Sequence, residues 1–164
     1  MDTSTEMGPL VSDEQFQKVS GYIESGKSEG GEIIAGGKYD NSNGGHFVHP
    51  TVFSKTNADM KLVKEEIFGP VVCAQPFSDE SLEKIASDAN NTSFGLAASV
   101  WTKDISVAHK LAAKIRAGTV WVNCHNIFDA SLPFGGYKES GWGREMGHEV
   151  LKNYTEVKAV TVSL

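Results

Sequence analysis

In this 164-residue sequence, the glycine-rich segment 135–144 has residue types that could bind a phosphate group. It reads GGYKESGWGR, and backbone N–H groups in glycine loops often bind phosphate. A P-loop requires Gly-x-x-x-x-Gly-Lys-Ser/Thr and a dinucleotide-binding turn requires Gly-x-Gly-x-x-Gly. Gly141, Gly143 and Gly147 are instead spaced Gly-x-Gly-x-x-x-Gly. The pattern alone therefore favours a tight, shaped surface loop.

The two cysteines, Cys73 and Cys124, are too few and too far apart for a disulfide framework or a zinc site. Cys124 ends an apolar run, where a nucleophile could lie. A reactive thiol needs a base or a positive environment, but the neighbouring His125 should point away from it on an extended chain. We therefore predict that Cys124 is a small, buried or half-buried residue and not a nucleophile.

The five histidines have no metal-binding spacing such as His-Glu-x-x-His, and no metal site is predicted. They are His46, His49, His109, His125 and His148. His109 falls on a helical pattern and is expected at the surface or its boundary. His125 opens a long loop, where a structural role is the favoured interpretation.

Two neighbouring carboxylates, Glu65 and Glu66, precede an apolar strand in the string KEEIFGPV. Two acids at a turn usually form a solvated corner. A carboxylate beside an aromatic ring, such as Glu66 near Phe68, could instead hydrogen-bond vicinal hydroxyls and pack against a flat group. Ribose binding requires that combination. The pattern favours the solvated corner and leaves the second interpretation open.

The overall composition indicates one ordinary globular domain, with 40% hydrophobic and 22% charged residues. The net charge of −6 and the lack of a Lys/Arg cluster argue against nucleic-acid binding. No apolar run approaches the roughly 20 residues of a membrane helix. The first six residues are polar and acidic, without a signal-peptide core. We expect a soluble, cytoplasmic protein that does not bind membranes.

The first half of the chain is predicted to begin with a helix over residues 12–29. Ser12 and Gln15 have the spacing of a capping box at its start, and Gly30-Gly31 ends it. A turn is indicated by Asn43-Gly44-Gly45. Extended segments are predicted at 32–35 and at 47–53, the latter interrupted by Pro50.

Residues 71–123 read as strand, helix, strand, helix, strand, the order of an α/β fold with a parallel open sheet and covering helices. The strands are predicted at 71–74, 97–101 and 119–122, and the helices from about Ser78 and after the cap Asp104. The strands are expected to be buried on both faces. The second helix should bury Ile105, Ala108, Leu111, Ala112 and Ile115, and Gly118 should end it. Ligands usually bind beyond strand carboxyl ends, which points to the loop at about 124–144. A short helix near 145–151 and a β-rich stretch at 154–162 follow.

Several strings resemble the aldehyde dehydrogenase superfamily and occur in that family's order. They are MGPL at 7–10, KEEIFGPV at 64–71, Asn123 at the start of the active-site loop, PFGGYKESGWGRE at 133–145 and YTEVK at 154–158. The resemblance covers nearly the whole chain. It implies the C-terminal part of such a polypeptide, with 1–152 in the catalytic, substrate-binding domain and 153–164 as an oligomerisation strand.

The resemblance also implies roles for single residues. Glu66 matches the glutamate that hydrogen-bonds the nicotinamide ribose of NAD or NADP, and Phe68 matches the aromatic residue that packs near that ribose. Phe128 and Phe134 match positions that line the aldehyde tunnel. Glu145 matches an acidic residue near the active site with a proton-relay role.

The chain departs from the family in lacking the Gly-Gln-x-Cys string that holds the nucleophilic cysteine. In the family this string lies upstream, as do the glycine-rich dinucleotide-binding half, the general-base glutamate and the oxyanion-stabilising asparagine. The family's thiolate attacks the aldehyde, hydride passes to NAD(P)+ and water releases the acid. We therefore expect these 164 residues to be inactive alone.

The resemblance also implies a substrate and partners. NCHNIFD at 123–129 with LPF at 132–134 most resembles phenylacetaldehyde-type enzymes, whereas betaine aldehyde enzymes tend to carry tryptophan at the position of Phe134. Arylalkyl aldehydes are the predicted substrates. Arg144 and Glu156 match charged positions associated with structural pairing near the subunit interface. In the family, the C-terminal strand helps to build the oligomer sheet, so a homo-oligomer, dimer or tetramer, is expected. The alternative is a non-catalytic module that assembles with a full-length partner. It is less favoured because Glu66 and Phe134 are intact.

Overall fold

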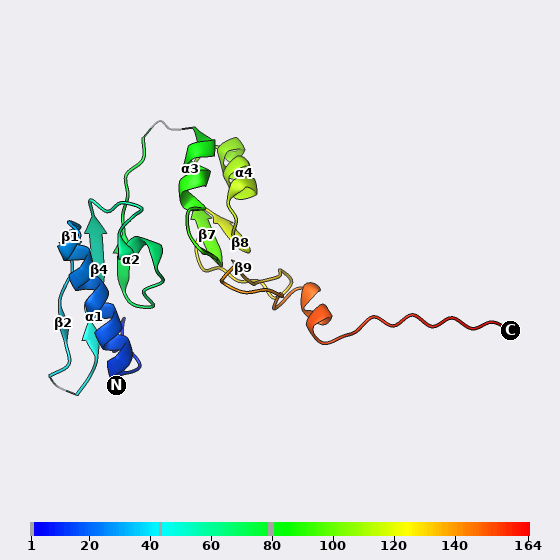
Figure 1. The fold of residues 1–164 in the computed structure, drawn as a ribbon, viewed down its shortest axis with the longest axis horizontal. Helices are drawn as coiled ribbons and strands as arrows, with labels where there is room; N and C mark the ends of the chain where they lie inside the picture. The colour runs from blue at the N-terminus through cyan, green and yellow to red at the C-terminus, as the bar shows by residue number, and fades with distance from the viewer. Residues whose placement is uncertain (1, 43, 79–80) are drawn as a thin grey trace. The chain divides into compact units, whose positions relative to one another are not determined.

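The computed structural model describes residues 2–42, 44–78 and 81–164, and the chain divides into two compact units, Met1–Ser78 and Asp79–Leu164 (Figure 1). Both units combine helices with short strands, so the predicted α/β class is confirmed. No helix within the described ranges is long and apolar enough to cross a membrane.

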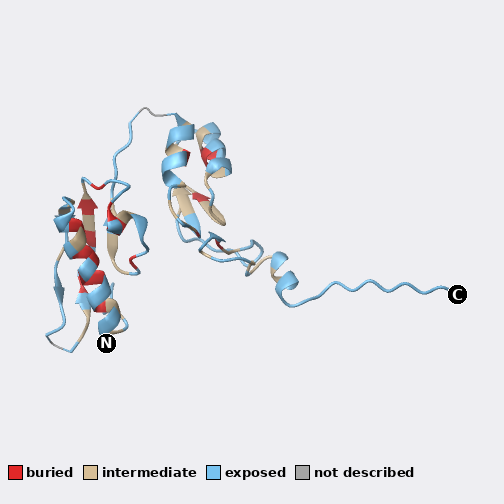
Figure 2. Cartoon of the chain, viewed as in Figure 1, coloured by how far each residue is buried: buried red, intermediate tan, exposed pale blue. Residues whose placement is uncertain are grey.

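The first unit packs a long helix against a three-stranded sheet. Its elements are α1 (Asp13–Ser28), β1 (Glu32–Ala35), β2 (Tyr39–Asp40), β3 (Phe47–Val48), β4 (Thr51–Ser54), α2 (Lys61–Lys64) and β5 (Val71–Cys73). The sheet has the order β1-β4-β5, with β1 antiparallel and β5 parallel to β4, while β2 and β3 form a separate antiparallel pair. Figure 2 shows the buried positions gathered along α1 and β4.

Local sequence explains where α1 begins and which face it buries. The Ser12 hydroxyl accepts a hydrogen bond from the Gln15 backbone N–H at 3.2 Å, which satisfies one unpaired donor of the first turn. Phe16, Val19 and Ile23 then fall on one face and are buried against the sheet residue Phe53. Of the predicted turn at 43–45, Asn43 lies outside the described residues. The strand break at Pro50 separates β3 from β4 as predicted.

The second unit contains a parallel strand pair with two helices. Its elements are α3 (Leu82–Ala89), β6 (Phe94–Gly95), β7 (Ala97–Val100), α4 (Ile105–Lys114), β8 (Thr119–Val122), β9 (Tyr137–Lys138) and the 3-10 helix η1 (Glu149–Asn153). β7 and β8 are parallel, and β6 and β9 are antiparallel. Ala86, Val100 and Leu111 form the buried core between helices and strands. The Asp104 carboxylate caps α4 by accepting from the N–H groups of Ser106 and Val107 at 2.8 and 3.2 Å.

The prediction of one β-α-β-α-β unit over 71–123 is wrong. β5 pairs with β4 inside the first unit, whereas β7 and β8 pair only with each other among the described strands. The order of elements along the chain does not specify which strands pair. β4 lies closer to β5 in the sequence than β7 does, and β5 pairs with β4. The prediction that the strands are buried on both faces is also wrong for β5, because the Val72 side chain is exposed.

Three further predictions are corrected at the helix ends. α3 begins at Leu82 after the cap Ser81 rather than near Ser78. Ile105 is exposed because it is the first residue of α4, and core contacts begin with Val107 and Ala108. Near the C-terminus, a 3-10 helix at Glu149–Asn153 replaces the short helix predicted at 145–151.

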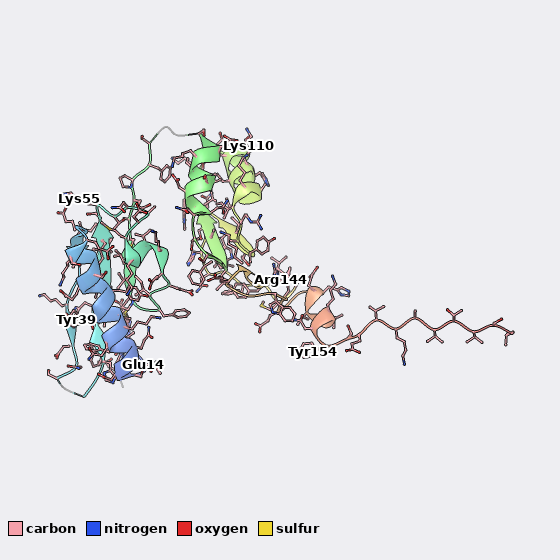
Figure 3. The ribbon with its side chains drawn as sticks, viewed as in Figure 1. Glu14, Tyr39, Lys55, Lys110, Arg144 and Tyr154 are labelled. Atoms are coloured by element: carbon pink, nitrogen blue, oxygen red, sulfur yellow. The ribbon has the colours of Figure 1, made fainter. Side chains whose placement is uncertain are left out.

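Residues 155–164 are exposed and have no regular secondary structure (Figure 3). A β-strand is defined by hydrogen bonds to a neighbouring strand, and none of the described strands pairs with this stretch. The assignment of 153–164 as an oligomerisation strand therefore stays a prediction.

Candidate functional site

The turn Glu66-Ile67-Phe68 in the first unit presents a carboxylate and an aromatic ring to solvent. Ile67 is buried in the core and fixes the middle of the turn, so that its two neighbours face outward. Phe68 adopts a left-handed backbone conformation with φ 52°, and its side chain is 68% exposed. A non-glycine residue in this conformation is strained and needs support from its surroundings.

Gln15 provides that support. Its side-chain amide donates to the backbone carbonyls of Ile67 at 3.2 Å and Phe68 at 2.7 Å. The predicted capping box is thus half wrong, because Ser12 caps the helix but the Gln15 side chain binds the turn instead of the helix start. The sequence missed this role because the two carbonyls lie more than 50 residues away, and a glutamine at this position fits a capping box equally well.

The two neighbouring glutamates have different environments. The Tyr22 hydroxyl donates to Glu65 Oε2 at 2.6 Å, and this hydrogen bond, with burial and the carboxylate charge, raises the pKa of Tyr22 to about 12. Glu65 is therefore tied to α1. Glu66 is exposed beside Phe68 and can accept hydrogen bonds from a ligand. The first carboxylate is structural, and only the second is a candidate for binding.

The two cysteines lie in different units and are both partly buried. Cys73 lies on β5, its thiol donates to the Leu62 carbonyl at 3.5 Å, and burial raises the pKa of the thiol. Cys124 is half-buried, as predicted. The adjacent His125 binds Ser99 through Nδ1 at 2.7 Å and packs against Trp121, which fits its predicted structural role.

In the second unit, the structure brings Phe128 and Phe134 together. Their rings contact edge to face, with centroids 5.1 Å apart and planes at 78°. Phe128 also meets the ring of Trp121 on β8 at 5.7 Å and 89°. The cluster follows the carboxyl end of β8, where ligand binding is expected for a parallel strand pair.

Glu145 is joined to Phe134 through the backbone. The Phe134 N–H donates to the Glu145 carbonyl at 2.8 Å, and the Glu145 N–H donates back at 2.7 Å, which closes the glycine-rich loop 135–144. Inside that loop, Arg144 Nη1 donates to the carbonyls of Gly136 at 3.0 Å and Gly143 at 2.5 Å. Arg144 therefore binds carbonyls of its own loop, which is a tight, shaped loop as predicted.

A hollow of about 360 Å³ lies beside this loop in the second unit. Leu96, Phe134 and Trp142 contribute apolar walls, and Arg144, Glu145 and Asn153 contribute polar groups. The exposed Glu145 thus lines the same hollow as Phe134. Glu66 and Phe68 belong to the first unit, whereas Phe128, Phe134 and Glu145 belong to the second.

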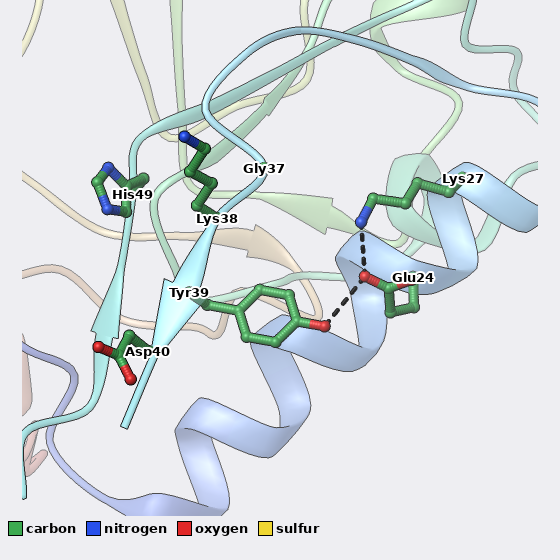
Figure 4. A pocket seen from close by; sticks show the side chains of 7 residues that line it. All are labelled: Glu24, Lys27, Gly37, Lys38, Tyr39, Asp40 and His49. Atoms are coloured by element: carbon green, nitrogen blue, oxygen red, sulfur yellow. Dashed lines mark hydrogen bonds and ion pairs between the residues drawn. The ribbon is translucent and has the colours of Figure 1, made fainter. Parts of the chain in front are cut away.

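Another hollow, of about 450 Å³ in the first unit, is lined by charged side chains (Figure 4). The Tyr39 hydroxyl donates to Glu24 Oε1 at 3.0 Å, and Lys27 Nζ forms an ion pair with the same oxygen at 2.7 Å. These hydrogen bonds lower the pKa of Glu24. The Glu24 carboxylate in this hollow is therefore already satisfied by its neighbours.

Comparison with known proteins makes the α/β assignment more specific. The model of the aldehyde dehydrogenase family matches residues 1–160, and the chain belongs to this family. A putative aldehyde dehydrogenase of Bacillus subtilis, DhaS, is 51% identical over 160 residues, 98% of this chain and 32% of that protein. The chain thus spans about a third of the length of this relative.

Two solved structures are similar over the whole chain. The NAD+ complex of an aldehyde dehydrogenase from Bacillus cereus is 54% identical with a TM-score of 0.93, covering 100% of this chain and 33% of that one. An indole-3-acetaldehyde dehydrogenase in complex with NAD+ is 41% identical with a TM-score of 0.94, covering 99% and 33%.

Proposed function

We propose that this chain is the C-terminal part of an NAD(P)+-dependent aldehyde dehydrogenase, in which it supplies one wall of the aldehyde tunnel and a contact to the nicotinamide ribose. The observation that carries the proposal is the turn at Glu66–Phe68, where buried Ile67 holds a carboxylate and an aromatic ring outward together. Membership of the aldehyde dehydrogenase family supports the same chemistry.

The residues present fit the cofactor. The Glu66 carboxylate can accept hydrogen bonds from both ribose hydroxyls, and the exposed face of Phe68 can pack against the flat nicotinamide side. When bound, the cofactor would supply the hydride acceptor for aldehyde oxidation. Gln15 keeps the turn in its strained form, so that both groups are preorganised before binding. The two similar solved structures contain NAD+, which favours NAD over NADP.

The substrate side of the proposal rests on aromatic side chains. Phe128 and Phe134 would form an apolar wall, which suits an arylalkyl aldehyde better than a cationic one. The similar indole-3-acetaldehyde dehydrogenase is named for an arylalkyl aldehyde. Glu145, in the hollow beside Phe134, would relay a proton between the bound molecule and solvent.

We propose that neither Cys73 nor Cys124 supplies the reacting thiolate and that the 164 residues alone are inactive; the raised pKa of the Cys73 thiol supports this for Cys73. The exposed stretch 153–164, with its β-branched residues, is proposed to pair with a second copy in a cytoplasmic homo-oligomer.

Absorbance of NADH with phenylacetaldehyde as substrate tests these proposals. We expect no turnover by the isolated chain. We expect turnover by a hybrid in which the chain replaces the matching third of the Bacillus cereus enzyme. In the hybrid, Glu66→Gln should raise the KM for NAD severalfold.

Glu65→Gln is the matched control, because Glu65 bonds Tyr22 and should affect stability rather than the KM for NAD. Robust turnover by the isolated chain would contradict its inactivity. An unchanged KM for NAD in the hybrid Glu66→Gln would contradict the role of the turn.

A further inference from the structure

Trp121 contacts the loop that carries Phe128 at three points. It is the third residue of β8 and only 8% exposed. Its indole Nε1–H donates to the Ile127 carbonyl at 2.7 Å. Its ring also meets the rings of His125 at 5.2 Å and Phe128 at 5.7 Å, both edge to face. One buried side chain thus touches three of the four residues from 125 to 128.

The start of the same loop is fixed by other residues. Asn123, with φ 54°, both accepts from the Thr102 N–H and donates to the Thr102 carbonyl through its side-chain amide, each at 2.9 Å. His125 is held by Ser99 at 2.7 Å. Asn126 is again left-handed, with φ 59°. Side-chain hydrogen bonds at Asn123 and His125 therefore hold the chain before it reaches Phe128.

Beyond Asn126 the anchors change. Ile127 and Phe128 are both exposed, so burial does not hold them in place. In the described part of the chain, the Ile127 carbonyl accepts a hydrogen bond from the Trp121 indole N–H. The Phe128 ring contacts the ring of Trp121 and the ring of Phe134. The position of Phe128 relative to Phe134 thus depends on the indole.

We propose that Trp121 is a positioning residue that sets aldehyde selectivity by fixing Ile127 and Phe128 against Phe134. The inference rests on the proposed function and extends it to a buried side chain that would not touch the substrate. A tryptophan that merely fills the core would be replaceable by another large aromatic residue without changing selectivity.

The indole hydrogen bond can be tested directly in this chain. With 15N-labelled tryptophan, NMR resolves three indole N–H signals, because the sequence has three tryptophans. Trp101 and Trp142 are 68% and 96% exposed and serve as internal controls. We expect the Trp121 N–H to exchange with solvent at least about tenfold more slowly than either control. Exchange as fast as that of Trp142 would overturn the proposal.

Selectivity is tested in the complete hybrid enzyme described above. Trp121→Phe keeps an aromatic ring and removes the N–H donor, and Trp101→Phe is the matched control. We expect the preference in kcat/KM for phenylacetaldehyde over acetaldehyde to fall by about 2- to 10-fold, as one neutral hydrogen bond allows. The KM for NAD should not change, since the cofactor contacts lie elsewhere.

A double variant separates positioning from general damage. Because Trp121 acts through Phe128, Trp121→Phe should add little to the selectivity lost in Phe128→Leu. Additive losses, or unchanged selectivity in an active Trp121→Phe hybrid, would overturn the inference. An inactive parent hybrid would contradict the proposed function instead, and the exchange measurement would still decide the indole contact.

Discussion

Substituting Gly118 by alanine should displace the loop that carries Phe134. Gly118 precedes β8, and a Cβ atom placed on it would lie 1.6 Å from the backbone oxygen of Gly135. The contact is between two backbone segments, so no side chain can rotate away. Gly135 directly follows Phe134, whose N–H and carbonyl bind Glu145 at 2.8 and 2.7 Å. Any movement of Gly135 therefore strains this bridge.

The size of the movement follows from the structure. Real Cβ atoms essentially never approach closer than 3.0 Å, so the two segments must separate by roughly 1.4 Å. Overpacking of this kind typically costs about 1–3 kcal/mol, and the loss of one of the two bridge hydrogen bonds adds about 1 kcal/mol. We expect Gly118→Ala to destabilise the second unit by about 2–4 kcal/mol.

Tryptophan fluorescence during urea unfolding measures this effect. The three tryptophans, Trp101, Trp121 and Trp142, all lie in the second unit and report on it alone. With a urea slope of about 1 kcal/mol/M for a small unit, the transition should move down by about 2–4 M or disappear. In the hybrid enzyme, the preference for phenylacetaldehyde should also fall.

Gly21→Ala is the control, because nothing lies within 4 Å of a Cβ atom there. Gly21 is inside α1, where alanine should stabilise the first unit by about 1 kcal/mol without moving the fluorescence transition. A fluorescence midpoint for Gly118→Ala within about 0.5 M of the parent would refute the reasoning, since it would mean that the two backbones separate at no cost.

Three further predictions concern single side chains. In the hybrid enzyme, Gln15→Met should raise the KM for NAD by about 2- to 10-fold, because the backbone carbonyls of Ile67 and Phe68 lose their hydrogen-bond donor. The control Gln17→Met, on the same helix, should leave the KM for NAD unchanged. Asp104→Ala should cost the second unit about 1 kcal/mol in urea unfolding and Asp104→Asn much less, because asparagine also caps helices; equal losses would contradict this. Hydrogen bonding to Glu65 raises the pKa of Tyr22 from about 10 to about 12. The contribution of this hydrogen bond to the stability of the first unit is therefore complete below pH 10 and is lost as the pH rises through 12. Tyr22→Phe should remove that part of the pH dependence from circular dichroism unfolding curves, and identical curves for parent and variant would exclude the effect.

The most accurate sequence predictions concern features that neighbouring residues control. α1 begins at Asp13 because Ser12 can cap it, and the strand breaks at Pro50 because proline has no N–H to donate. Asp104 caps α4 for the same local reason. The family strings also indicate Glu66 and Phe134 as candidates, because each stands in a string that matches the family residue by residue.

The tertiary structure decided the features that depend on distant partners. Gln15 fits a capping box in sequence, but its amide binds carbonyls more than 50 residues away. Gly118 was predicted to end α4, yet the helix ends at Lys114, and the glycine is needed where the Gly135 backbone passes close by. β5 was assigned to the wrong strand partners because an apolar run specifies a strand but not its neighbour. The sequence by itself therefore determined the longer elements of the fold and which residues are candidates for the site. Only folding determined which side chains hold those residues in place, because such contacts join segments whose spacing in sequence carries no periodic signal.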